Sequence, residues 1–600
     1  MNKTFKVNYL ARDFQSIKQE LKNYASRYYS EQFSDLSEAS INSLMIDAAA
    51  YIGDVLSYYI DYQANESFLS TAIESKNIVA LAKSLGYRKQ NGSTTVGKVA
   101  LFMLIPATTN NLPDFSRTPI IKKGTSVVTN DGSRTFIINE DIIIDENLIG
   151  TNYVVARTNT AGSPTYFAIK VYVPVISGVI KTVDIPIGNF TKYNKIALSD
   201  FNVSEIISIV DSEGNEYYEV SNLTQNIVYK SVLNRDSTDS SVRYILKTVS
   251  AQRRYVVDYD NNLTYLIFGG KQYKPDDDLT INPITEPSKF IISSYNNDYL
   301  KDGYFEPNKL LNGDDTGVAP DNTTLTITYR VNSSLNNSAL AGEITGIKSL
   351  DYSFNNSLII PQTTIDTIVN SIQVINEESI TNGGTTISDN ELKDLAGAIF
   401  QSQNRAVTSK DYETLTYMMP GKYGSIKRVK AERDTYSLKN NINLYIIGVD
   451  ALGNLAKTNT KLKENLKYWL SDYKMLTDSV DIMDAKIINL GIDYKILIDP
   501  NFDKIAVKSL VDAQLAYVYA SKSYIGQAFS KLDVYREIRK IKGVLDIIDL
   551  KVKVINGTGY SNLYFNILEN TTSDGNMILM PKNAIYEIKN PTLDITGTAI

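Results

Sequence analysis

The 600-residue sequence contains no histidine and no cysteine. Histidine is the usual general base and metal ligand near neutral pH, and cysteine is the usual thiolate nucleophile. Their absence excludes Ser-His-Asp and Cys-His catalysis, the common zinc sites and Fe–S ligation within this chain. It also leaves no disulfide to stabilise the fold. This inventory predicts a structural or assembly protein that is not an enzyme, with no catalytic residue, no metal site and no cofactor.

Long runs of apolar residues and of like charge are also absent. No apolar run approaches the ~18 residues needed to span a bilayer, and residues 1–19 lack the apolar core of a signal peptide. We therefore expect no membrane insertion, and synthesis in a cytoplasm. The net charge is only −6, and basic residues form short, interrupted clusters. Nucleic acid is therefore not the expected partner.

The composition is otherwise that of a globular protein. Hydrophobic residues make up 43% and charged residues 21% of the chain, so extensive disorder is not expected. The length predicts about three to five domains. The 41 tyrosines suit half-buried contacts between subunits, although a coding bias toward Asn, Lys, Ile and Tyr explains them equally well.

A helical module is predicted for residues 1–92. Its first helix places apolar side chains at alternating spacings of four and three, the a/d pattern of a coiled-coil seam. The seam consists of Leu10, Phe14, Ile17, Leu21, Tyr24 and Tyr28. A stripe this narrow favours another helix over a broad sheet, so we expect it to bind a partner helix. A charge at Phe14 or Leu21 is then expected to abolish assembly and leave the β-domain folded.

The second predicted helix begins near Ser40 and has two contrasting sides. One side is apolar and carries Ile41, Leu44, Met45, Ala48, Ile52, Val55, Leu56 and Tyr59. The other side repeats Asp47, Asp54 and Asp61 every seven residues. Carboxylates at this spacing lie about 10 Å apart along a helix, too far to share one metal ion. They are expected to form a solvated stripe or the docking edge of a partner. A third helix is predicted to end at a left-handed Gly86.

The remainder of the chain predicts a multi-domain α+β fold. Its parts are the N-terminal helical module, a central β-sandwich or barrel-like domain and small C-terminal α+β domains. Ser388 with Glu391, and Thr408 with Asp411, have the spacing of capping boxes that begin helices. The expected division is a β-rich domain at 93–345, a connecting segment at 346–387, α+β domains at 388–480 and 481–556, and a C-terminal strand arm at 557–600.

Two groups of residues resemble the baseplate J-like family, which builds the wedges of contractile phage tails and related injection machines. The second helix is similar to the large wedge subunit of myophages, and the segment around residue 410 resembles the family signature. The matching positions are Asp47, Asp54, Asp61, Asn65, Arg405, Thr408, Asp411, Gly421, Gly526 and Gly543. Phe268 is followed by two glycines and a lysine, where the family often has an FGDG-like turn.

This resemblance implies a non-enzymatic baseplate wedge protein of the virion tail, made in the cytoplasm of the host. Subunits of this type are expected to dimerise within a wedge and to join six wedges into a ring around the hub. Their N-terminal helices bundle with a long helical wedge partner, and they also contact the sheath-initiator subunit. The ring would couple baseplate rearrangement to sheath contraction. We interpret Arg405, Thr408 and Asp411 as local structure.

Two other classes of function need neither histidine nor cysteine. A tail-associated polysaccharide hydrolase could use an Asp/Glu pair without any histidine, and would need a cleft with two carboxyl groups about 5–10 Å apart. A receptor-binding adhesin would show β-repeats, and the sequence has no internal repeat. Both are ranked below the wedge interpretation.

Overall fold

The computed structural model describes residues 13–29, 40–87, 94–145, 152–160, 162–233, 244–260, 263–273, 316–332, 337–354, 360–381, 388–434, 441–450, 452–520 and 523–600. The chain divides into two compact units. The first unit comprises residues 1–89 and 387–403, and the second unit comprises residues 90–386 and 404–600. The predicted class is confirmed: helices at the N-terminus, then curled sheets, then small α+β elements.

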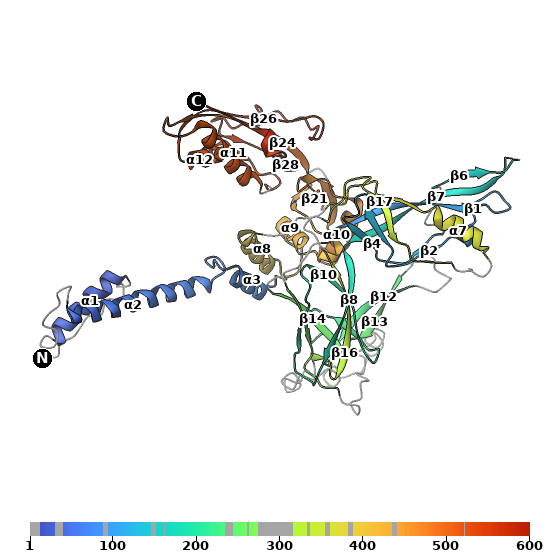
Figure 1. The fold of residues 1–600 in the computed structure, drawn as a ribbon, viewed down its shortest axis with the longest axis horizontal. Coiled ribbons are helices and arrows are strands. Elements are labelled where there is room, and N and C mark those ends of the chain that lie inside the picture. Colours follow the sequence, from blue (N-terminus) through green and yellow to red (C-terminus); the bar gives the residue numbers. More distant parts are fainter. Residues whose placement is uncertain are drawn as a thin grey trace. The chain divides into compact units, whose positions relative to one another are not determined.

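The first unit is helical (Figure 1). Its helices are α1 (Phe14–Tyr28), α2 (Ile41–Glu66), α3 (Ser75–Ser84) and α8 (Asp389–Ser402). Side chains of Asp13 and Ser40 cap the first turns of α1 and α2 by accepting backbone N–H bonds. Gly86 follows α3 at a φ of 99°, the left-handed conformation that the sequence predicts for a helix end.

Helix α8 packs on α3, although the two helices are about 300 residues apart in sequence. Leu392 and Ala396 of α8 are buried with Ile78 and Ala82 of α3 in one small core. The Lys393 ammonium donates to the backbone carbonyl of Ala72 at 2.7 Å. The helix at 389–402 thus lies with the N-terminal helices, and not with the α+β domain to which the sequence-based division assigned it. Periodicity identifies an apolar helix face but does not indicate which surface covers it.

The second unit begins with a β module that we call the first β module. Its seven-stranded sheet has the order β17-β3-β4-β7-β1-β19, with β6 also pairing with β7. The bounds are β1 (Val96–Pro106), β3 (Ser126–Thr129), β4 (Thr135–Ile138), β6 (Tyr153–Thr158), β7 (Pro164–Ser177), β17 (Ile344–Ser349) and β19 (Gln373–Ile375). β1 pairs antiparallel with β7 from Val96 opposite Ile176 to Pro106 opposite Tyr166. A small sheet adds β2 (Ile120–Ile121), β5 (Ile142–Ile143) and β18 (Tyr352–Ser353).

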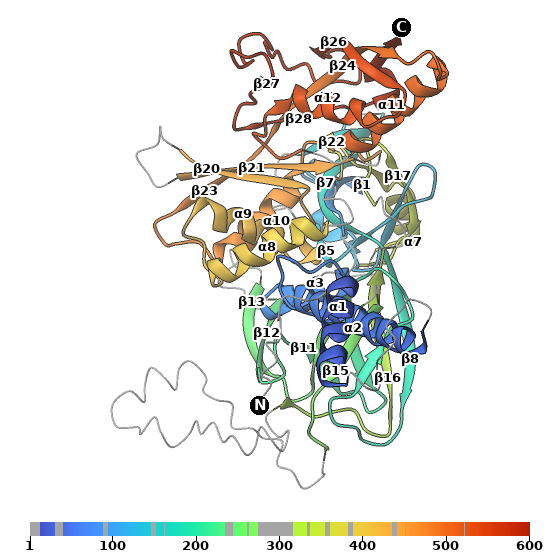
Figure 2. The same cartoon turned by 90° about the vertical axis from the view of Figure 1, so that its left-hand side faces the viewer.

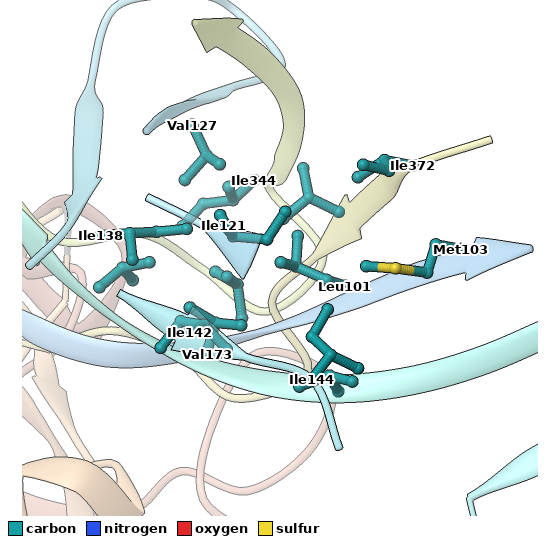
Figure 3. Close-up of a cluster of buried hydrophobic side chains, with 14 of the residues drawn as sticks. Leu101, Met103, Ile121, Val127, Ile138, Ile142, Ile144, Val173, Ile344 and Ile372 are labelled. Atoms are coloured by element: carbon teal, nitrogen blue, oxygen red, sulfur yellow. The ribbon is translucent and has the colours of Figure 1, made fainter. Parts of the chain in front are cut away.

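Apolar side chains from both sheets form the core of the first β module (Figure 3). Leu101 and Val173 of the large sheet pack with Ile121 and Ile142 of the small sheet. Residues 346–381, expected as part of a connecting segment, include β18, β19 and helix α7 (Gln362–Asn370). They belong to this module because β18 pairs with β2 and β19 pairs with β1.

The second β module has its own core, so the region expected as one β-rich domain contains two. Its sheet has the order β8-β16-β10-β11-β14-β15-β9. The bounds are β8 (Val179–Ile187), β9 (Lys195–Ala197), β10 (Val203–Asp211), β11 (Glu216–Glu219), β14 (Arg254–Asp260), β15 (Leu263–Phe268) and β16 (Thr323–Val331). Its core includes Ile209, Leu266 and Ile327. β12 (Ile227–Leu233) and β13 (Tyr244–Ser250) form a separate antiparallel ribbon.

An α+β module follows. Its sheet consists of β20 (Arg428–Arg433), β21 (Asn441–Val449), β22 (Leu455–Ala456) and β23 (Ser479–Asp484), covered by α9 (Ser409–Tyr417) and α10 (Thr460–Ser471). The capping boxes predicted for Ser388–Glu391 and Thr408–Asp411 are both present at the starts of α8 and α9.

The C-terminal module is built around β24 (Lys486–Ile498). Ile492, Tyr494, Ile496 and Ile498 alternate along this strand and are all buried, whereas residues 488–492 are buried on both sides of the strand. Helices α11 (Lys504–Ala520) and α12 (Lys531–Arg539) pack against the sheet (Figure 2). The remaining elements are β25 (Phe529–Ser530), β26 (Val544–Val554), β27 (Met577–Ile578), β28 (Ala584–Glu587), α13 (Pro591–Asp594) and β29 (Ile595–Ala599).

The end of the chain differs from the expected strand arm. β28 and β29 both pair in parallel with β24, inside the C-terminal module. Ile578, Ala584, Ile585 and Ile595 are buried. The sequence predicts the short strands themselves but does not show which strand each of them pairs with. Residues 577–599 are therefore part of a folded sheet.

Candidate interaction surface on the N-terminal helices

Helix α1 packs on a side of α2 that is rich in small residues. Ser43, Ile46 and Ala50 of α2 are buried there. A Cβ atom added at Gly53 would lie 3.3 Å from the Cδ1 atom of Ile17 on α1, so the glycine permits a close approach of the two helices. The stripe of small side chains lets α1 lie directly along α2 (Figure 1).

The three aspartates that repeat every seven residues along α2, Asp47, Asp54 and Asp61, have different environments. The Lys18 ammonium of α1 lies 2.7 Å from the Oδ1 atom of Asp47, which places this carboxylate beside the α1–α2 contact. Asp54 is half-buried, and Asp61 is exposed. Glutamate and aspartate are the only charged residues of α2, whose sequence has four acids and no lysine or arginine. The helix is therefore strongly acidic along its length.

The predicted seam on α1 is only partly available to another chain. Leu10 lies outside the described residues. Phe14, Ile17 and Leu21 are half-buried, and Ile17 faces Gly53 of the same chain. Tyr24 and Tyr28 are exposed, with ring centroids 4.9 Å apart. A role of this seam in binding another chain stays a prediction.

The broad apolar face of α2 is the larger unpartnered surface of this unit within the described residues. Its six large side chains are each more than half exposed: Ile41, Leu44, Met45, Ile52, Leu56 and Tyr59. Apart from the adjacent pair Leu44 and Met45, successive members are three, four or seven residues apart, so they form one continuous stripe along about 27 Å of helix. Exposed apolar patches of this kind mark interaction sites in soluble proteins.

Sequence reasoning identified this face but placed the partner seam on α1. The sequence also shows that the α2 stripe is wider than the α1 seam. That α1 packs on the opposite side of α2, and leaves this stripe exposed, is visible only in the structure.

A buried carboxylate fixes the turn between α2 and α3. Glu66 at the end of α2 accepts a hydrogen bond from the Asn77 side chain and one from the backbone N–H of Ile73, both at 2.8 Å. These bonds stabilise the charged form and lower the pKa of Glu66 below its ordinary value of 4.5. Sequence reasoning did not single out this residue.

The other residues that carry the family resemblance lie apart from one another. Asn65 is in the last turn of α2, where its backbone carbonyl accepts from the Thr71 hydroxyl at 2.7 Å. Thr408 and Asp411 cap α9, and Arg405 is exposed shortly before this helix. Gly421 is the buried first residue of a 3-10 turn, and its backbone carbonyl accepts from the Thr94 hydroxyl.

Gly526 and Gly543 are backbone positions of the C-terminal module. Their φ angles are 77° and 99°, a region that favours glycine. A Cβ at Gly543 would lie 3.0 Å from the Phe502 ring. The family-motif residues of the second unit thus shape the backbone and are not brought together into one site.

Within the described residues, no group of three or more acidic side chains is placed so that it could hold a metal ion. In the same part of the chain, no helix combines the length and the apolar character that crossing a bilayer requires.

Comparison with known proteins gives a match to a protein family and matches to solved structures. Residues 13–84 match the family described as "Bacteriophage baseplate protein, N-terminal domain". A chain of the cryo-EM structure of the anti-feeding prophage baseplate, six-fold symmetrised, is 9% identical, with 98% of this chain and 100% of that chain covered and a TM-score of 0.29. No curated protein matches the chain. The N-terminal helical segment is therefore similar to the N-terminal domain of bacteriophage baseplate proteins, which supports a structural role in a phage baseplate.

Proposed function

We propose that this chain is a baseplate wedge subunit of a contractile phage tail. It would dimerise within a wedge, join six wedges into a ring around the hub and couple baseplate rearrangement to sheath contraction. One observation carries the proposal: the segment that matches the baseplate domain, residues 13–84, is the segment that presents the exposed apolar face of α2.

The α2 face suits a helical partner. Its side chains form a stripe parallel to the helix axis, and a second helix laid along it would bury them by packing between them. Burying a Leu or Ile side chain contributes about 1.5–3 kcal/mol. Six such side chains would contribute on the order of 9 kcal/mol, comparable with the roughly 4–15 kcal/mol that association costs. The face could therefore offset much of the cost of association, and contacts elsewhere between the two chains would add to it.

The acids of α2 do not compete with this packing. Asp47, Asp54 and Asp61 lie on the other side of the helix from the apolar face, and the Lys18 ammonium of α1 lies 2.7 Å from the Asp47 carboxylate. The proposal assigns the long helical wedge partner to the α2 face because a helix matches the shape of the stripe. The homodimer contacts and the contact with the sheath initiator would then use other surfaces.

The location of the chain in the particle tests the proposal. Purified tail particles would be labelled with a gold-conjugated antibody raised against this chain and imaged by electron microscopy. We expect label in a ring at the distal end of the tail, where the baseplate lies. Label on side fibres or along the tube, or particles without label, would contradict the wedge assignment. Hydrolysis of capsule or peptidoglycan by the purified chain would favour the polysaccharide hydrolase.

A further inference from the structure

The chain passes from the first β module to the second through a single residue, and it returns between the end of β16 at Val331 and the start of β17 at Ile344. β7 of the first β module ends at Ser177, and β8 of the second β module begins at Val179. Gly178 lies between them at a φ of 117°, which residues with a side chain rarely adopt. Its backbone N–H donates to the carbonyl of Thr135 in the first β module at 3.1 Å. Gly178 is thus hydrogen-bonded to the first β module and is followed directly by a strand of the second β module.

A fully buried arginine lies beside this connection. Arg330 is near the end of β16, where its neighbours across the sheet are Ile180 on β8 and Glu205 on β10. The exposed fraction of Arg330 is 0%. A Cβ atom at Gly178 would lie 3.0 Å from the Cγ atom of Arg330 and 2.5 Å from the Oδ1 atom of Asn332. Only glycine fits at the connection while these side chains keep their positions.

The Arg330 guanidinium is hydrogen-bonded in both modules. Its Nε atom donates to the Glu205 carboxylate at 3.3 Å, within the second β module. Its Nη2 atom donates to the side-chain oxygen of Asn139 at 3.2 Å, and Asn139 directly follows β4 of the first β module. Nη1 has no hydrogen-bond partner within the described residues. The same side chain therefore bridges two sheets that have separate cores.

This arrangement is poorly suited to stability alone. Burial lowers the pKa of Arg330, and the Glu205 carboxylate opposes that shift. A buried ion pair often stabilises no more than apolar side chains of equal volume, and a guanidinium with an unsatisfied N–H is less favourable still. Such a contact is directional, however. It is lost over a small displacement, whereas an apolar contact can slide.

We propose that Gly178 is a hinge between the two β modules and that Arg330 is its lock. In the locked state Arg330 bonds to Glu205 and Asn139 together. When the second β module turns about Gly178, Arg330 stays paired with Glu205 in its own module, and the bond to Asn139 breaks.

The test uses the absence of cysteine, which lets two introduced cysteines be spin-labelled uniquely. Lys348→Cys places one label on β17 of the first β module, and Glu213→Cys places the other in the turn after β10 of the second; both positions are exposed. Double electron–electron resonance then measures the distance distribution between the modules in the full chain.

In the otherwise unchanged chain we expect a single narrow maximum. Asn139→Ala removes the acceptor of the first β module and is expected to produce a second, displaced maximum, with its population raised by about an order of magnitude. Glu140→Ala changes the adjacent exposed side chain and is the matched control, with an unchanged distribution expected. Arg330→Met removes the lock from the other side and should populate the same displaced maximum as Asn139→Ala.

Asn139→Ala decides the outcome, because this half-buried polar side chain can be shortened with little effect on either core. A folded Asn139→Ala chain with the narrow, unshifted maximum would overturn the proposal, even if Arg330→Met lowers the melting temperature. Arg330 would then be a structural ion pair only.

Discussion

At the scale of single residues, the sequence predicts the hydrogen bonds between residues that are close together in the chain. Ser388 bonds to Glu391 and Thr408 bonds to Asp411 as their spacing of three requires, because a capping box is completed within one helical turn. Arg330 and Asn139 are 191 residues apart, and nothing in either segment indicates that they meet. The contacts of Glu66 span an intermediate distance in sequence, because its partners lie 7 to 11 residues further along the chain. A turn separates them from Glu66, and helical periodicity does not predict how that turn folds.

The Thr408 cap can be tested by substitution. Its hydroxyl accepts the backbone N–H of Asp411 at 3.2 Å, and Asp411 in turn accepts the N–H of Thr408 at 2.8 Å. Thr408→Ala should lower the free energy of unfolding of the α+β module by about 1 kcal/mol. Thr408→Ser keeps the hydroxyl and should change it little. Chemical denaturation followed by the fluorescence of the single tryptophan, Trp469 of α10, measures both. If both variants lose the same free energy of unfolding, the Thr408 hydroxyl does not stabilise the module.

The Glu66 carboxylate should give the first unit a pH-dependent stability. Because its pKa is lowered in the folded chain, its contribution is complete above pH 4.5 and is lost as the pH falls through the folded pKa. Glu66→Gln should therefore melt at a lower temperature than the unchanged chain near neutral pH, with the difference shrinking in acid. Far-UV circular dichroism at several pH values measures this difference. A gap that stays constant below pH 4.5 would contradict the role of the charge.

At the scale of elements, periodicity identified helices and strands but not the partner of each surface. The apolar face of α2 was expected, yet the contact with α1 uses the small-residue side, because Ala50 and Gly53 allow a closer approach than large side chains do. The alternation of Ile492, Tyr494, Ile496 and Ile498 along β24 is visible in the sequence. The parallel pairing of this strand with β28 and β29 is not, because register between distant strands leaves no trace in either strand alone.

Two aspartate substitutions distinguish the two faces of the helical hairpin. Ile17→Asp removes a half-buried apolar side chain from its contact with Gly53 and places a charge there, which should destabilise the α1–α2 pair by roughly 1–3 kcal/mol. Ile52→Asp adds the same charge where the side chain is 57% exposed and should change stability by less than about 0.5 kcal/mol. Differential scanning calorimetry of the full-length variants compares them. Equal destabilisation would mean that the α2 face is already covered within the chain.

At the scale of the whole molecule, the proposed function depends on surfaces that the chain offers to neighbouring subunits. Separate hydrophobic cores in the helical unit, the two β modules and the C-terminal module allow each part to stay folded while its contacts change. A ring that holds one state and later shifts needs such parts, joined by connections that turn at defined points. The lack of histidine and cysteine is consistent with this role, because assembly through packed faces needs neither.

The most direct measurement of the central claim is incorporation of a face variant into particles. Ile52→Asp would be the only form of the chain made during particle assembly, and its content in purified particles would be quantified by mass spectrometry. Gln15→Asp adds the same charge to the exposed side of α1 and serves as the matched control. The account predicts that Ile52→Asp is folded but missing from particles, whereas Gln15→Asp is present at the normal level. Normal incorporation of Ile52→Asp would contradict the claim that the α2 face attaches this chain to its neighbours.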